Sequence, residues 1–246
     1  MIFFITGGSR GIGAAIVRDV LAAGHDVAFT YVTNADLAAE QMSWARQHAA
    51  ESTCRAYPLD ISDSTAVERT VDQVLEDFGD VDVVVNSAAI NKATLAISMS
   101  DKDWCDVIGT NLTGTFYVCR QFLPVFLANG RGRFIHLSSI AAAGMTGVSA
   151  YAASKAGLNG LSMTLAKEYG RKGITSNVLT LGFFDTDMTR EQLPDRAKQF
   201  WAMLCPVGRM GEVHEVSGAV LYLASDAGSF LNGEAISLAG GMTWAS

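Results

Sequence analysis

Short apolar runs alternate along the chain with longer stretches in which apolar residues recur at helical spacing. The apolar runs, such as residues 81–86, are nearly continuous and do not alternate with polar residues. Strands of this kind are covered on both faces, which is typical of a parallel sheet between two layers of helices. The pattern predicts strands at residues 2–6, 27–32, 55–59, 81–86, 133–138, 175–180 and 235–238. It predicts helices near residues 11–23, 35–50, 64–78, 101–128, 150–170 and 213–225.

Strands and helices alternate over the whole length, and no repeat and no linker rich in Pro, Gly or Ser divides the chain. A length of 246 residues suits one large domain. The sequence therefore predicts an α/β fold: a single doubly wound domain over residues 1–246, with a seven-stranded parallel sheet and helices on both faces. The irregular stretch at 182–212 is the exception. Because a long insertion in a compact α/β domain is typical of a lid, we expect a substrate lid there.

The charge composition narrows the range of partners. Charged residues make up 17% of the chain, against about 25% in an average globular protein. This low fraction leaves more uncharged surface than a monomer usually has, which favours an oligomer. The net charge of −7 argues against DNA or RNA as a partner, because phosphate binding requires a cationic face. An anionic cofactor remains compatible, since a local pocket can be positive on an acidic protein.

The cysteines lie far apart in the sequence, and no histidine stands near them at metal-ligand spacing. We expect Cys54, Cys105, Cys119 and Cys205 to be reduced and packed as small apolar residues, without a metal site. This favours an intracellular, cytoplasmic protein. The apolar start at residues 1–5 is too short for a signal peptide. No apolar run approaches the ~18 residues of a membrane span.

A glycine-rich segment, TGGSRGIG at residues 6–13, directly follows the first predicted strand and opens the first helix. Gly7, Gly11 and Gly13 let the backbone turn tightly and let phosphates approach the N–H groups at the helix start. The segment could be only a tight strand–helix connection. However, ligands bind at the carboxyl ends of the strands in doubly wound sheets, and this favours a dinucleotide site.

Two ionisable side chains, Tyr151 and Lys155, stand at i and i+4 on one face of a predicted helix. A tyrosine with an ordinary pKa of about 10 transfers protons poorly at neutral pH, and a neighbouring ammonium lowers that pKa. Ser138 and Ser139 end the fifth predicted strand, where a hydroxyl could donate to a substrate oxygen. Taken alone, these could be a surface tyrosine, an exposed lysine and a serine that caps a helix or turn.

Asn111 falls inside the predicted helix at 101–128, although asparagine is a poor helix former. Its side chain could point to water, or it could hold a bulge or a water molecule near the site.

Eight motifs give the chain a resemblance to the short-chain dehydrogenase/reductase family, and within it most to the β-ketoacyl-acyl-carrier-protein reductases. The motifs are TGGSRGIG (6–13), LD (59–60), NSAA (86–89), NLTGTF (111–116), LSS (137–139), YAASKAG (151–157), LGFFDTDM (181–188) and LNGEAISLAGGM (231–242). They follow the family's order and spacing over essentially the whole chain. The resemblance implies a Rossmann fold and reduction of a ketone, as a 3-oxoacyl thioester, in fatty-acid or polyketide-type biosynthesis.

The resemblance also implies a catalytic tetrad of Asn111, Ser139, Tyr151 and Lys155. Tyr151 would protonate the carbonyl oxygen, and Ser139 would hydrogen-bond it. Lys155 would hold the nicotinamide ribose and depress the pKa of Tyr151, while Asn111 would anchor a water that relays protons. The residues implied to bind the cofactor are Gly7, Ser9, Arg10, Gly11, Ile12, Gly13, Asp60, Ile61, Asn86, Ala88, Tyr151, Lys155, Phe184 and Thr186.

The implied contacts of the cofactor differ along its length. Asp60 and Ile61 would flank the adenine. Asn86 and Ala88 would line the adenosine ribose. Phe184, by its backbone, and Thr186 would meet the carboxamide and the pyrophosphate.

Three positions depart from the family pattern. Ala89 replaces a usual glycine, Leu181 a usual proline, and Ala239 a usual aspartate near the carboxyl end. Together they suggest a specialised member of the family. The loop between serine and tyrosine is one residue shorter than usual if Ser139 is the catalytic serine. Counting from Gly132 favours Ser139, and Ser138 remains an alternative.

We expect the cofactor to be NADP(H). Enzymes with this sheet that use NAD place an acidic residue at the end of the second strand. Here residues 30–34 contain no carboxylate that would repel a 2′-phosphate. Arg10 is the cation expected beside that phosphate, unless it simply lies in solvent.

We expect the acyl chain to arrive on the phosphopantetheine arm of an acyl carrier protein or coenzyme A. The segment after Gly182 is apolar enough to cover such a chain, through Phe183, Phe184, Met188, Leu193, Phe200, Trp201, Met203 and Leu204. Basic residues before the fifth and sixth strands, Arg131, Arg171 and Lys172, could dock an acidic carrier. They could instead only complement helix dipoles.

The resemblance implies a homotetramer, which the composition permits. Apolar residues occupy more than one face of the helices predicted near 101–128 and 150–170, and the lid is the other possible cover for them. Two other functions share the same residues. An alcohol or sugar dehydrogenase would differ in cofactor and lid, and a dinucleotide-sensing protein would not need an intact tetrad.

Overall fold

The predicted strands form one parallel sheet in the order β3-β2-β1-β4-β5-β6-β7, in a computed structural model that describes residues 1–186 and 195–242. The strands are β1 Ile2–Thr6, β2 Asp26–Tyr31, β3 Cys54–Pro58, β4 Val83–Asn86, β5 Gly132–Ser139, β6 Ile174–Leu181 and β7 Ala235–Leu238. Every neighbouring pair is parallel. The order reverses between β1 and β4, which places a binding crevice at their carboxyl ends. The predicted fold class is confirmed.

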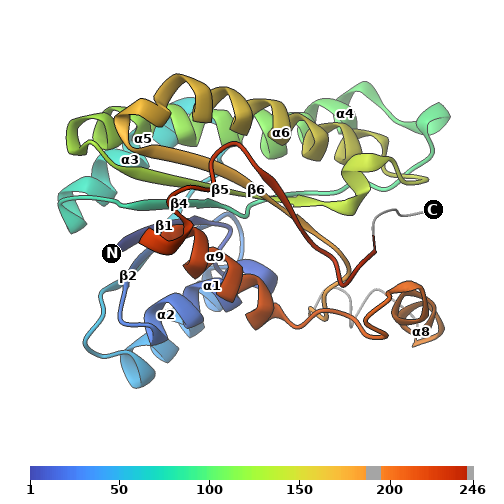
Figure 1. Ribbon diagram of the computed structural model, residues 1–246, viewed down its shortest axis with the longest axis horizontal. Helices are drawn as coiled ribbons and strands as arrows, with labels where there is room; N and C mark the ends of the chain where they lie inside the picture. Colours follow the sequence, from blue (N-terminus) through green and yellow to red (C-terminus); the bar gives the residue numbers. More distant parts are fainter. Residues whose placement is uncertain (187–194, 243–246) are drawn as a thin grey trace.

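Helices cover both faces of the sheet (Figure 1). They are α1 Gly11–Ala22, α2 Ala35–His48, α3 Ser64–Phe78, α4 Asp101–Ile108, α5 Thr115–Asn129, α6 Ser149–Tyr169, α8 Asp195–Leu204 and α9 Val213–Ala224. Short turns of helix add η1 Ala96–Ser98, η2 Gly109–Gly114, η3 Ile140–Ala143, η4 Gly170–Lys172 and η5 Asp226–Gly228. Helices α1, α2 and α9 lie on one side of the sheet, and α3, α4, α5 and α6 lie on the other.

The hydrophobic core has two layers, because strand side chains alternate between the two faces. On one face Ile5 and Val85 pack with Val17 of α1 and Val220 of α9. On the opposite face, Phe4, Val84 and Phe134 pack with Phe122 and Phe126 of α5. The strands therefore need apolar residues at both odd and even positions, which explains their continuous apolar runs.

Two predicted regions differ from the structure. The helix predicted at 101–128 is divided by η2, a wider π-helical turn, into α4 and α5. The segment predicted as irregular at 182–212 contains helix α8, whose short amphipathic pattern lies between the glycine and proline residues around it. The remaining boundaries agree with the prediction or differ from it by one or two residues; β4, for example, begins at Val83 and not at residue 81.

Candidate active site

The glycine loop joins the end of β1 to the start of α1 and is packed against the end of β4. Gly7 has a φ of +70°, a left-handed conformation that favours glycine. A Cβ atom on Gly13 would lie 2.2 Å from the carbonyl oxygen of Gly7, so any side chain there would displace the loop. Helix α1 begins at Gly11 with no acidic residue in its first turn, and no side chain caps it at Arg10. This end of the helix suits a phosphate group.

Two threonines that the motif analysis did not single out hold this loop in place. The Thr6 hydroxyl accepts hydrogen bonds of 3.0 Å from the N–H groups of both Ser87 and Ala88, which ties the end of β1 to the segment after β4. The Thr30 hydroxyl accepts one from the Gly7 N–H at 3.2 Å. Hydroxyl residues at the ends of two neighbouring parallel strands were the available signal in the sequence.

Tyr151, Ser139 and Lys155 come together at the carboxyl end of β5. The hydroxyl groups of Tyr151 and Ser139 are hydrogen-bonded to each other. The Lys155 Nζ lies 5.7 Å from the centre of the Tyr151 ring and donates a 2.6 Å hydrogen bond to the carbonyl oxygen of Leu137. Lys155 is buried, so the alternative of an exposed lysine on a surface helix is wrong.

Burial shifts the pKa values of both Tyr151 and Lys155. It raises the pKa of Tyr151, and the hydrogen bond with Ser139 offsets the effect in part. This direction is opposite to the depression expected from the lysine, and its cause is the loss of hydration around the phenol. Burial also lowers the pKa of Lys155 to about 8. At neutral pH the tyrosine therefore keeps its proton and the lysine keeps most of its charge.

The two serines at the end of β5 have different surroundings. Ser138 is buried, and its hydroxyl donates a 3.0 Å hydrogen bond to the carbonyl oxygen of Lys155. Ser139 is partly exposed; its hydroxyl contacts Tyr151 and accepts a 3.2 Å hydrogen bond from the Ala141 N–H. Only Ser139 is therefore in a position to contact a ligand at Tyr151.

Asn111 lies within η2 and is buried. Its amide group bonds both backbone groups of Ile90, accepting from the N–H at 2.8 Å and donating to the carbonyl at 2.9 Å. It also donates to the Ser154 hydroxyl at 3.1 Å, and Ser154 donates to the carbonyl oxygen of Tyr151 at 2.7 Å. Asn111 thus connects the segment after β4 to α6 beside Tyr151, and it does not point to water.

The residues implied to contact the adenosine lie around the ends of β3 and β4. Asp60 accepts from the N–H and hydroxyl of Ser62, and Ile61 is buried against the π-helical turn at Gly114. The Asn86 side chain is buried. Its Nδ2 lies 3.1 Å from Nδ1 of His136.

His136 is the centre of a buried polar chain that crosses the sheet from β4 to α6. Its Nε2 lies 3.1 Å from the Ser176 hydroxyl, which lies 2.9 Å from the Ser162 hydroxyl. Burial and the charge of Lys155 lower the pKa of His136 to about 3, so it is neutral at physiological pH. His136 could not be predicted from the sequence, because a single histidine in an apolar strand carries no distinctive pattern.

The remaining predicted site residues belong to the loop after β6. Phe184 is buried and pairs with Gly211 in an isolated parallel bridge, whereas Thr186 is partly buried. Beyond this point, Met188 and Leu193 lie outside the described residues. On α8, Trp201 stacks on Phe183 with ring centres 4.0 Å apart.

Comparison with known proteins places this geometry in a family. Residues 7–243 match a family described as Enoyl-(Acyl carrier protein) reductase. The chain is 35% identical over 242 residues to the 3-oxoacyl-(acyl-carrier-protein) reductase FabG of Escherichia coli, covering 98% of this chain and 96% of the relative. It is 37% identical over 242 residues to FabG of Chlamydia trachomatis, covering 97% and 95%. The chain belongs to the short-chain dehydrogenase/reductase family. It is therefore an oxidoreductase, and the resemblance stated from its motifs is confirmed.

Members of the short-chain dehydrogenase/reductase family use a nicotinamide dinucleotide, and the residues present fit such a group. The glycine loop has no room for a side chain at Gly7 or Gly13, since a Cβ on Gly7 would lie 2.9 Å from the Ala88 Cα and one on Gly13 would lie 2.2 Å from the Gly7 oxygen. The open start of α1 would receive phosphates there. The buried Lys155 reaches the same edge of the sheet from α6.

The departures from the family pattern lie around this edge. Leu181 ends β6 opposite Ser139, and the Gly182 that follows packs closely on Ala239. Within residues 1–186 and 195–242, no cluster of His, Cys, Asp and Glu residues could hold a metal ion. None of the helices described in those two ranges is long and apolar enough to cross a membrane.

Proposed function

We propose that this oxidoreductase reduces the ketone of a 3-oxoacyl thioester with NADPH. One observation carries the proposal: the hydroxyls of Tyr151 and Ser139 meet at one point, beside a buried lysine. Two converging hydroxyls can both donate to one carbonyl oxygen. The relatives named as 3-oxoacyl-(acyl-carrier-protein) reductases support this substrate class.

Within this site Tyr151 acts as the general acid. A bound reduced nicotinamide supplies the hydride for the carbonyl carbon. The Tyr151 phenol, kept protonated by its raised pKa, gives its proton to the oxygen as negative charge develops there. Ser139 donates a hydrogen bond to the same oxygen. The Lys155 ammonium stabilises the phenolate that remains after this transfer. Asn111 anchors the water through which a proton returns to the site.

The lid at 182–212 excludes water from the reacting carbonyl group. Trp201 of α8 stacks on Phe183, and both pack against the apolar cluster that includes Ile140, the residue after Ser139. Apolar groups around a reacting carbonyl exclude water and strengthen the hydrogen bonds made to it. Residues 1–246 then act as a single domain in which the lid closes over the acyl chain.

NADPH is the preferred cofactor. Residues 30–34, at the end of β2 and just after it, carry no carboxylate, and Arg10 is exposed at the start of α1. A guanidinium at this position binds the 2′-phosphate that distinguishes NADPH from NADH. The phosphates contact the glycine loop through residues 7–13, with Ser9 and Ile12 at its centre.

An acyl carrier protein docks at Arg131, Arg171 and Lys172. Arg171 and Lys172 are exposed, whereas Arg131 is ion-paired with Asp82. These residues precede β5 and β6, so the length of a strand, roughly 23 Å for eight residues, separates them from Ser139. The carrier's arm has to span that distance or serve another protomer.

The docking test reverses two charges without breaking the ion pair of Arg131. Arg171→Glu with Lys172→Glu should raise KM for carrier-bound substrate and leave a small N-acetylcysteamine thioester unaffected. Equal effects on both substrates would show that the two residues have only a structural role.

The assembly is a homotetramer. On α4, α5 and α6, Trp104, Phe116 and Met163 expose 41%, 42% and 46% of their surface. Apolar side chains on adjacent helices favour burial against another copy of the chain. Light scattering at micromolar concentration should give four times the mass of one chain, and the mass of a monomer would refute the assembly.

The protein acts in the cytoplasm. The cysteines Cys54, Cys105, Cys119 and Cys205 are all free, as expected where thiols stay reduced. Fractionation of native cells, followed by detection of the protein, tests this location.

A spectrophotometric assay tests the function. Loss of the absorbance of NADPH is followed with acetoacetyl-N-acetylcysteamine, crotonyl-N-acetylcysteamine and simple ketones, and formation of NADPH from NADP⁺ is followed with alcohols and sugars. Turnover of the first alone supports the proposal. Turnover of the crotonyl thioester would make the protein an enoyl reductase. Oxidation of an alcohol or sugar without thioester reduction would make it a dehydrogenase of that class, and binding without turnover a sensor.

A further inference from the structure

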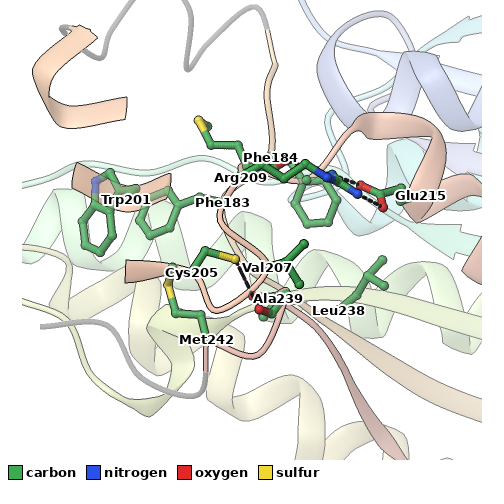
Figure 2. A pocket seen from close by; sticks show the side chains of 13 residues that line it. Phe183, Phe184, Trp201, Cys205, Val207, Arg209, Glu215, Leu238, Ala239 and Met242 are labelled. Atoms are coloured by element: carbon green, nitrogen blue, oxygen red, sulfur yellow. Dashed lines mark hydrogen bonds and ion pairs between the residues drawn. The ribbon is translucent and has the colours of Figure 1, made fainter. Parts of the chain in front are cut away.

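A cavity of about 160 Å³ lies beyond the carboxyl end of β6, beside the catalytic edge of the sheet. Three segments form its walls: the residues after β6, the end of α8 with the following loop, and the end of β7 with the residues after it. Figure 2 shows Phe183 and Trp201 on one side of it, and Cys205, Ala239 and Met242 along another.

The walls of this cavity are apolar. The Arg209 guanidinium at its rim is bound through two hydrogen bonds of 2.7 and 2.8 Å to the Glu215 carboxylate. The Cys205 thiol donates to the carbonyl oxygen of Gly240 at 3.3 Å. Ala239 contributes only a methyl group to the wall. An apolar cavity of similar size, about 150 Å³, stays dry and binds benzene. The chemistry of the cavity therefore suits a hydrocarbon group.

The cavity adjoins the catalytic serine. In the register of β5 and β6, Ser139 lies opposite Leu181, two residues before Phe183. Ile140, which follows Ser139, packs in one apolar cluster with Cys205 and Met242. A hydrocarbon chain that extends from a carbonyl at Ser139 therefore meets this cluster first and the cavity next.

We propose that this cavity binds the distal end of the substrate's acyl chain, and that Cys205 and Ala239 set the preferred chain length. The inference rests on the proposed reduction of 3-oxoacyl thioesters. A volume close to that of a benzene-binding cavity accommodates about six carbon atoms. The preferred substrates are therefore medium-length chains, and the shortest thioesters leave the cavity unfilled.

Substitutions at one position test the proposal in both directions. Cys205→Met fills the cavity with a flexible side chain, and Cys205→Ala enlarges it. Cys105→Met is the matched control, because Cys105 is exposed on α4. The reduction of 3-oxobutanoyl, 3-oxohexanoyl, 3-oxooctanoyl and 3-oxodecanoyl N-acetylcysteamine thioesters is measured for each protein.

In the unsubstituted protein kcat/KM should rise about fourfold for each methylene that enters the cavity. Cys205→Met should abolish this rise while keeping the rate with the 3-oxobutanoyl thioester, and Cys205→Ala should move the optimum to a longer chain. A Cys205→Met protein with an unchanged chain-length profile, or with the same loss for every chain, would overturn the proposal. If Cys205→Met does not fold, Cys205→Val replaces it under the same criteria.

A binding measurement tests the cavity assignment independently of ketone reduction. Octanoyl-N-acetylcysteamine has no ketone to reduce, and a ligand that binds only the folded state raises Tm. It should raise the Tm of the unsubstituted protein and of Cys105→Met but not that of Cys205→Met. If no thioester is reduced and this difference persists, the proposed function fails and the cavity assignment stands. Equal shifts in all three proteins would overturn the cavity assignment itself.

Discussion

The Ser138 hydroxyl donates a 3.0 Å hydrogen bond to the backbone carbonyl of Lys155, while the ammonium of Lys155 donates to the carbonyl of Leu137. Two consecutive residues of β5 thus hold one residue of α6 from both its backbone and its side chain. The next residue of the strand, Ser139, contacts Tyr151. The neighbouring serines therefore have different partners: Ser138 holds the backbone of α6, and Ser139 contacts Tyr151, where we propose that the ligand binds.

Substituting the two serines separately should distinguish these tasks. Ser139→Ala removes a donor to the carbonyl oxygen, so kcat should fall roughly 10²- to 10³-fold with little change in Tm. Ser138→Ala removes a buried hydrogen bond worth about 1 kcal/mol, so Tm should fall by roughly 2–4 °C with a smaller loss of kcat. Steady-state kinetics and thermal melts measure both. A larger kinetic loss at Ser138 would reverse the assignment.

Replacing Tyr151 with phenylalanine should remove the general acid and keep the ring. The expected fall in kcat is roughly 10²- to 10⁴-fold, because the phenol supplies the transferred proton. NADPH affinity, measured by fluorescence titration, should stay close to that of the unsubstituted protein. Tyr222→Phe, on the half-exposed Tyr222 of α9, is the control. Near-normal turnover of the Tyr151 variant would rule out the mechanism.

Reduction should slow at alkaline pH. The pKa of Lys155 is lowered to about 8 by burial, so its charge is present below that pH and disappears above it. The pKa of Tyr151 is raised, so the phenol does not lose its proton in the same range. We expect kcat/KM to fall about tenfold per pH unit above about pH 8. The measurement is a profile from pH 6 to 10, and a flat profile would contradict the role of the lysine charge.

Arg10→Glu should lower kcat/KM with NADPH and leave kcat/KM with NADH unchanged. The exposed guanidinium at the start of α1 is the group proposed to bind the 2′-phosphate, and a carboxylate there would repel it. Loss of a charge-assisted hydrogen bond and gain of repulsion should lower kcat/KM for NADPH about 10- to 100-fold. Arg69→Glu, on the exposed surface of α3, is the control. Equal losses for both cofactors, or an original preference for NADH, would contradict the assignment.

The neutral histidine in the sheet should make the protein sensitive to acid. Its pKa is about 3 in the folded protein and about 6.5 when unfolded, so unfolding takes up close to one proton between these values. The contribution of His136 to stability is complete above pH 6.5 and falls by about 1.4 kcal/mol per pH unit below it. Urea unfolding of the protein and of His136→Asn, compared between pH 7 and 4.5, should give a shallower slope for the variant. Replacing the exposed His48 should leave the slope unchanged.

Periodicity and spacing were sufficient to predict the sheet, because the five inner strands are buried on both faces and the helices repeat at their own period. Residues 64–78 and 2–6 were predicted with the bounds they have in the structure. Helix α8 was missed because its ten residues give only a short apolar pattern, although Pro194 and Asp195 at its start are typical of the beginning of a helix. The division of the helix at 101–128 was not foreseen, because a π-helical turn depends on partners such as Ile90 that are distant in sequence.

The parts of the candidate site that lie within one local sequence motif were predicted. The spacing of Tyr151 and Lys155 indicated a shared helical face, and counting along β5 favoured Ser139. The net direction of the Tyr151 pKa was wrong, because burial depends on the packing of the whole fold and not on the lysine alone. Thr6 and His136 were missed for the same reason, since their partners come from other strands.

The π-helical turn makes the geometry of the candidate site depend on the number of residues between α4 and α5. Such a turn holds one residue more than an ordinary helical turn, and one residue corresponds to a rotation of about 100°. Removing a single residue from η2 would therefore swing the buried face of α5, with Val118 and Phe122, away from the sheet or pull Asn111 off Ile90. Segment 109–114 should accept no deletion, so its length is constrained as strictly as Asn111, with its hydrogen bonds, and Gly114, which has no room for a side chain.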